Sequence, residues 1–170
     1  MANLSHLSEG EMKEILMLQE RLTLLDTQHK AKDSFMEYIR YIWPSFIEGD
    51  HHRIIAEKLT RVAKGELKRL IVNMPPRHTK SEFASIYFPS WVMGLNPDMK
   101  IMQTTHTADL SINFGRKVRN LMDSDEYSNI FSKVSLASDS KSAGKWQTSQ
   151  GGEYFAAGVG GAIAGRGADL

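Results

Sequence analysis

The stretch that most constrains the fold of this chain runs from Leu70 to Ile86. An apolar run, Leu70-Ile71-Val72, leads into Pro75-Pro76, and Lys80-Ser81 then opens a segment with helical apolar spacing. Strand, loop and helix in this order are typical of a phosphate-binding loop, where backbone N–H groups and the helix dipole converge on an anion. In such a loop Lys80 would reach the phosphate oxygens and the Ser81 hydroxyl would hold Mg²⁺.

The loop departs from the pattern G-x-x-x-x-G-K-[ST] at both glycines, where Met74 and Thr79 stand. Thr79 is unfavourable if its position needs a positive φ, because a β-branched side chain makes the left-handed region costly. From the pattern alone, a strand–turn–helix with a solvated Lys80 explains the stretch as well as a phosphate loop does.

The surrounding sequence favours the phosphate loop. Met74-Pro75-Pro76-Arg77-His78-Thr79-Lys80-Ser81-Glu82 resembles the P-P-R-H-G-K-S-E form of the Walker A loop in the large terminase subunits of tailed phages, with Thr79 where that family usually has Gly. The resemblance covers roughly residues 33 to 170. Three further stretches agree with the family in order and spacing: His51-His52-Arg53-Ile54-Ile55, Thr104-Thr105-His106-Thr107-Ala108-Asp109-Leu110 and Gly165-Arg166-Gly167-Ala168-Asp169-Leu170.

The resemblance implies an α/β fold of the P-loop NTPase type (ASCE or RecA-like), with a parallel sheet flanked by helices. Residues 33–170 would be a partial ATPase domain with an incomplete sheet, and residues 1–32 an amphipathic helix and a loop. The family uses ATP and Mg²⁺ to drive double-stranded DNA into the capsid. Its partners are the portal protein and the small terminase subunit, and it works in the host cytoplasm as a ring-forming homo-oligomer.

The resemblance also assigns roles to single residues. Lys80 and Arg77 are the expected catalytic residues, Arg77 by stabilising charge on the γ-phosphate; its alternative is an ion pair with a carboxylate elsewhere. His51 and His52 match the adenine-contacting segment, but surface or helix-capping histidines would look the same. The metal ligand is Ser81, and the expected nucleotide-binding positions of the loop are Pro76, Arg77, His78, Thr79, Lys80, Ser81 and Glu82.

The rest of the chain predicts mainly helices. Ser8 and Glu11 form a capping box for a helix to about Asp26, which either packs on the domain or is an arm that docks on another protein. A loop at 27–32 should follow. Further helices are expected at 33–43, 51–64, 81–92 (kinked or divided at Pro89) and 108–122, with strands at 70–73 and 100–104 joined by right-handed crossovers. A surface segment at 123–142 and a hairpin of 146–148 with 153–157 complete the prediction.

Two segments leave alternatives open. Arg116, Lys117 and Arg119 are either a basic strip toward DNA or a solvated helix face. The glycine-rich segment from Gly158 to Gly167 is either a functional loop that carries Arg166 or a flexible hinge.

Composition narrows the function classes. The net charge of +1 does not indicate a nucleic-acid binder in bulk, and the absence of cysteine excludes disulfides and thiol catalysis. No apolar run is long enough to span a membrane, so we expect a soluble protein.

Hydrolysis would also need an apolar strand that ends in an acidic pair, and the sequence contains none. In the terminase family that strand follows the stretch matching 165–170, and the family's nuclease domain is missing too. We therefore expect nucleotide binding with poor hydrolysis by this chain alone. The rival functions are a helicase-like ATPase, a non-catalytic assembly module and, more distantly, a small-molecule kinase.

Overall fold

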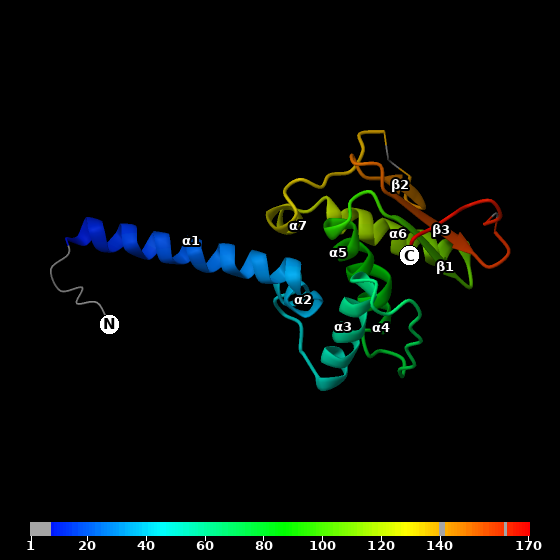
Figure 1. Cartoon of the computed structure of the whole chain (residues 1–170), viewed down its shortest axis with the longest axis horizontal. Helices are drawn as coiled ribbons and strands as arrows, with labels where there is room; N and C mark the ends of the chain where they lie inside the picture. The colour runs from blue at the N-terminus through cyan, green and yellow to red at the C-terminus, as the bar shows by residue number, and fades with distance from the viewer. Residues whose placement is uncertain (1–7, 140–141, 162) are drawn as a thin grey trace.

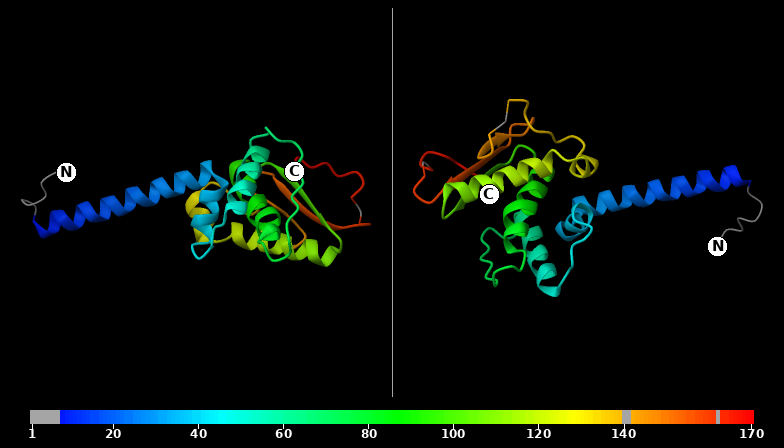
Figure 2. Two further views of the ribbon diagram at one scale, coloured as in Figure 1. Left: turned by 90° about the horizontal axis from the view of Figure 1, so that it is seen from below. Right: turned by 180° about the vertical axis from the view of Figure 1, so that it is seen from behind.

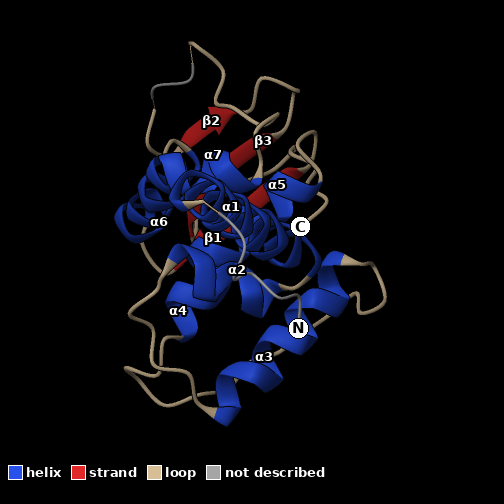
Figure 3. Ribbon diagram, turned by 90° about the vertical axis from the view of Figure 1, so that its left-hand side faces the viewer, coloured by secondary structure: helices blue, strands red, loops and turns tan. Residues whose placement is uncertain are grey.

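A small mixed sheet lies at one side of the molecule (Figure 1, Figure 3). The computed structural model describes residues 8–139, 142–161 and 163–170. Within them, β1 (Lys100–Thr105) pairs in parallel with β3 (Glu153–Gly158), and β2 (Lys145–Gln147) pairs antiparallel with β3. The strand order is β1-β3-β2. The class is therefore α/β, and the predicted strand at 100–104 and hairpin are confirmed.

The helix α6 (Ala108–Met122) connects β1 to the hairpin and packs on the sheet. Its buried stripe contains two small residues, Ser111 and Gly115, which let the helix approach closely. A Cβ on Gly115 would stand 2.9 Å from the ring of Tyr154, and the Trp146 indole N–H donates to the Gly115 carbonyl at 3.1 Å. This contact fixes α6 on the sheet.

The prediction of a sheet strand at 70–73 is wrong. Residues 69–75 form neither helix nor strand and pair with no described strand, and Ile71 is 87% exposed. The edge of β1 that faces this segment is partly occupied instead by the end of the described chain: Met102 N–H donates to the Leu170 carbonyl at 2.8 Å, and Asp169 N–H to the Lys100 carbonyl at 2.8 Å. The parallel pairing in this molecule is between β1 and β3.

The helical half of the molecule surrounds an aromatic core. It consists of α2 (Phe35–Ile42), α3 (Asp50–Ala63), α5 (Phe88–Leu95) and α7 (Asp125–Ile130). The polar atoms buried there are paired: Tyr38 and Ser90 share a hydrogen bond of 2.7 Å, and Tyr127 O–H donates to the Ser90 carbonyl at 3.0 Å. The segment at 123–142, predicted to lie on the surface, contributes to this core through Tyr127, Ile130, Phe131 and Val134.

The first helix, α1 (Glu9–Asp33), extends far from the rest of the molecule (Figure 1, Figure 2). Its Ser8–Glu11 capping box is confirmed. The loop predicted at 27–32 is wrong, because the helix continues to Asp33, where Lys30 pairs with Asp26 at 2.6 Å and Ala31 is fully buried. No helix among the described residues is long and apolar enough to cross a membrane.

The helical run after the loop changes its winding. It begins as α4 (Lys80–Glu82), widens into the π-helical turn η1 (Phe83–Tyr87) and continues as α5, with Pro89 in the first turn of α5. Phe88 N–H donates to the carbonyl of Phe83, five residues back. Proline lacks the N–H that a continuous α-helix needs, and π-turns form where the regular bonding is interrupted. At the predicted kink or division near Pro89, the structure therefore has a π-helical turn that ends just before this proline.

Candidate phosphate-binding loop

The loop between 76 and 80 has a backbone of alternating handedness. Arg77 has a φ of 64° and Thr79 a φ of 57°, and they are the two non-glycine residues with positive φ in the described chain. Pro76 has a negative φ through its ring, His78 is negative, and Lys80 is helical. Alternation between negative and positive φ is the backbone pattern of anion nests, in which successive N–H groups turn toward one concave side.

Thr79 does occupy the left-handed region that the sequence makes costly, and its side chain is held there. The hydroxyl of Thr79 lies 2.7 Å from Nε2 of His52 and donates to the His78 carbonyl at 2.7 Å. Nδ1 of His52 accepts from the Gly49 N–H at 2.9 Å, so the proton of the neutral ring lies on Nε2 and is donated to Thr79. The imidazole therefore bridges the start of α3 to the loop.

His52 is buried, with 6% of its surface exposed. Its ring stacks on Phe83 at 5.3 Å between centroids and meets the edge of Phe46 at 4.7 Å. Burial, and next the neighbouring His51, lower the pKa of His52. Both ring nitrogens are already engaged, so the structure places His52 as a support of the loop and does not present it to a base.

The cations of the loop are available to a ligand. Arg77 and Ser81 are exposed and Lys80 is half-buried at the first helical position. Neither Arg77 nor Lys80 forms an ion pair with any carboxylate among the described residues. The alternative for Arg77, an ion pair elsewhere, is thus not seen in that part of the chain.

His51 and His78 lie beside the loop. The ring of His51 is 3.8 Å from that of His52 and 5.9 Å from that of His78, and His78 Nδ1–H donates to the Pro76 carbonyl at 2.9 Å. His51 also lines a cavity of about 270 Å³ between α3 and residues 70–74. It is exposed and next to the loop, so the prediction of an adenine contact stays open for His51.

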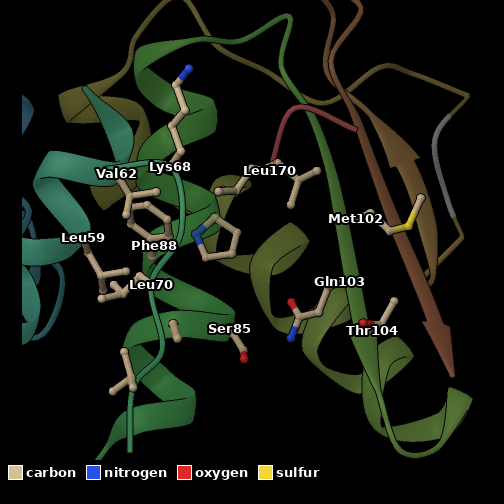
Figure 4. A pocket seen from close by; sticks show the side chains of 14 residues that line it. Leu59, Val62, Lys68, Leu70, Ser85, Phe88, Met102, Gln103, Thr104 and Leu170 are labelled. Carbon is tan, nitrogen blue, oxygen red and sulfur yellow. The ribbon is translucent and has the colours of Figure 1, made fainter. Parts of the chain in front are cut away.

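A second cavity, of about 410 Å³, separates the unpaired segment 68–72 from β1 (Figure 4). Ser85 and Gln103 reach into it from opposite walls, and Leu170 lies at its rim. A strand at residues 70–73 that paired with β1 would occupy this space. No group of three or more His, Cys, Asp or Glu side chains in the described ranges could hold a metal ion.

Other predicted residues lie apart from the loop. Arg166 lies over the Phe155 ring at 3.9 Å and pairs with Glu153 at 3.5 Å, so it is on the sheet. Thr105 shares a hydrogen bond of 2.7 Å with Ser111, and Thr107 caps α6. The predicted basic strip (Arg116, Lys117, Arg119) lies on α6.

Glu82 is half-buried in α4, next to Ser81. The structure thus brings together the loop residues, His51 and His52. Sequence reasoning missed the bond between His52 and Thr79, for which an unfavourable residue at a position of positive φ was the available signal.

Comparisons with protein-family models, with curated proteins and with solved structures found no match to this chain.

Proposed function

We propose that the loop at 76–81 binds the phosphates of ATP, and that the chain is the nucleotide-binding part of a viral DNA-packaging motor of the terminase type. The observation that carries the nucleotide proposal is a backbone nest at a helix start with two unpaired cations, Arg77 and Lys80. The motor, its double-stranded DNA, its portal and small-subunit partners and its ring assembly follow from the sequence resemblance alone.

In this proposal the loop residues act by position and charge. The nest amides hold phosphate oxygens, Lys80 neutralises the β- and γ-phosphates, and Arg77 reaches the γ-phosphate from the exposed side. Mg²⁺ would supply further neutralisation, bound by the Ser81 hydroxyl together with phosphate oxygens and water, which suits an ion that keeps few protein ligands.

We expect this chain to hydrolyse ATP slowly alone. Hydrolysis needs a carboxylate that orients or activates the attacking water. The sequence contains no apolar strand that ends in an acidic pair, which would supply this carboxylate. The function proposed for this chain is therefore binding of the nucleotide, with turnover dependent on further groups.

The test is a calorimetric titration with Mg²⁺ and a non-hydrolysable ATP analogue. We expect saturable binding that Lys80→Ala weakens roughly ten- to hundredfold, because a charge-assisted hydrogen bond contributes about 1.5–3 kcal/mol. Lys133→Ala, a control on a lysine that lines a cavity with Gly94 and Phe131, should leave the affinity unchanged. Absence of binding to the unmodified chain, or equal binding to Lys80→Ala, would refute the proposal.

The second candidate function is a non-catalytic assembly module. The exposed apolar residues of α1 favour it, since they require a partner whatever the loop does. One measurement distinguishes this function from nucleotide binding. Mg²⁺ and an ATP analogue raise the melting temperature of a nucleotide binder, but not that of an assembly module. A helicase-like ATPase would bind nucleotide too, and would respond to single-stranded nucleic acid.

A further inference from the structure

The helix α1 exposes an unusual amount of apolar surface. Only its carboxyl-terminal end meets the rest of the molecule, at α2, α5 and α7 (Figure 2). Monomers seldom leave such a surface contiguous and open to water, and an isolated helix lacks the packing that stabilises helices in proteins. Six large apolar side chains of α1 are between 49% and 65% exposed: Leu16, Met17, Leu18, Leu22, Leu24 and Leu25.

Part of this surface follows the spacing of a coiled coil. The half-buried Ile15 and the exposed Leu18, Leu22 and Leu25 follow one another at intervals of three, four and three residues, which are the a and d positions of two successive heptads. We call these four residues the α1 seam. Ile15 at the first a position and leucine at both d positions match the preference of two-stranded parallel coiled coils, whereas Leu22 at the second a position is not β-branched.

The α1 seam faces away from the body of the molecule. Ala31 is fully buried against the body, and its indole partner Trp91 donates to the Ala31 carbonyl at 2.9 Å. Nine residues separate Leu22 from Ala31, which at about 100° per residue puts them on opposite sides of the helix. His29, one heptad after Leu22, is on the seam side and its side chain is 75% exposed. A second helix can therefore lie along the seam without meeting α2 or α7.

The charges beside the seam identify the helix that fits it. Arg21 precedes Leu22 at a g position, and Asp26, which also pairs with Lys30 of its own helix at 2.6 Å, follows Leu25 at an e position. In a parallel pair of identical helices, each g residue faces the e residue of the next heptad of the other helix, so Arg21 meets Asp26 twice by symmetry. In the antiparallel pair with the same apolar layers, Arg21 would face Arg21, which is repulsive.

We propose that α1 associates with α1 of a second copy of this chain as a short parallel coiled coil through Ile15, Leu18, Leu22 and Leu25. The proposal rests on the exposure, spacing and charges of α1 and is independent of nucleotide binding. Both bodies then lie at the same end of the helix pair.

The first test is sedimentation equilibrium of the full chain from about 5 to about 300 µM, a range in which a weak dimer shows itself by mass action. We expect a monomer–dimer equilibrium that Leu22→Lys abolishes. Leu24→Lys is the matched control, since Leu24 is similarly exposed but lies outside the seam. A monomer throughout the range, or equal loss of the dimer in both variants, would overturn the proposal.

The second test reports the direction. The chain has no cysteine, so Leu25→Cys introduces a single thiol. In a parallel pair the two thiols share one layer and form a disulfide on mild oxidation. In the antiparallel pair Leu25 lies opposite Ile15, so the thiols are ten residues, or about 15 Å, apart and out of reach. A dimer that does not cross-link through Leu25→Cys would contradict the parallel arrangement.

Discussion

The bond between His52 and Thr79 makes a sharp prediction about the stability of the loop. Thr79→Val keeps the size and the β-branch of the side chain and removes only the hydroxyl. The Nε2–H of His52, in a ring with 6% of its surface exposed, then loses its partner. Removing one partner of a buried hydrogen bond costs the bond and the desolvation of the group left behind.

The expected cost follows from these terms. The bond itself contributes about 1 kcal/mol and an orphaned buried donor costs about 1–3 kcal/mol, so Thr79→Val should lower the free energy of unfolding by about 2 kcal/mol. Thr79→Gly also loses the bond but relieves a left-handed conformation that costs a non-glycine residue about 1–2 kcal/mol. Thr79→Gly should therefore be more stable than Thr79→Val, by about 1 kcal/mol.

The assay is a double-mutant cycle with His52→Phe, measured by chemical denaturation. Phenylalanine keeps the aromatic packing against Phe83 and leaves the Thr79 hydroxyl bonded to the His78 carbonyl. The coupling between positions 52 and 79 should be about 1–2 kcal/mol. The control is Thr60→Val, the same chemical change at a threonine whose hydroxyl bonds to the Ala56 carbonyl within α3; its coupling with position 52 should be near zero.

The refuting result is specific. A coupling below about 0.5 kcal/mol between positions 52 and 79 lies within the error of additivity and would mean that the hydrogen bond does not stabilise the loop. A Thr79→Val variant as stable as Thr79→Gly would mean that the positive φ of Thr79 carries no cost.

Two further predictions concern pH and packing. Burial lowers the pKa of His52 in the folded chain, so as the pH falls the unfolded chain, with a histidine pKa of about 6.5, takes up the proton first. The free energy of unfolding should therefore decrease below about pH 6.5 and level off above it. Urea titrations at several pH values would measure this decrease, which should be smaller in His52→Phe. Gly94→Ala should lower the free energy of unfolding by about 1–3 kcal/mol in the same assay, because its Cβ would stand 2.5 Å from the ring of Phe131. Gly10→Ala is the control and should not destabilise the chain, because the nearest atom to its Cβ is 4.0 Å away. Equal effects of the two substitutions would contradict the packing described.

The features that sequence analysis predicted correctly are those with local causes. The Ser8 capping box, the helix end before Gly65 with its φ of 73°, and the hairpin turn at Gly151 with its φ of 94° each depend on a few neighbouring residues. Helices 51–64 and 108–122 were placed within one residue of α3 and α6. The loop at 76–81 also consists of residues adjacent in the sequence, and its role as a phosphate-binding loop stays a prediction.

The errors come from contacts between distant residues. The segment 70–73 has the composition of a strand, but a strand needs an edge to pair with, and the described part of the β1 edge bonds to Asp169 and Leu170. The bond between His52 and Thr79 spans 27 residues, and its one sequence signal, a β-branched residue at a position of positive φ, does not identify His52 as the partner.

The π-helical turn at 83–87 also determines how the loop is rotated about the helix axis relative to α5. A π-turn behaves as one residue inserted into an α-helix, so deletion of a single residue there would restore regular winding and keep the helix. The deletion would, however, turn everything before it by about 100° relative to α5. Phe83 and Ile86 would leave the core, or Lys80 and Ser81 would point away from the nest. This short stretch should therefore tolerate substitutions on its exposed side, at Ala84, while a change of length within it misaligns the loop and the core.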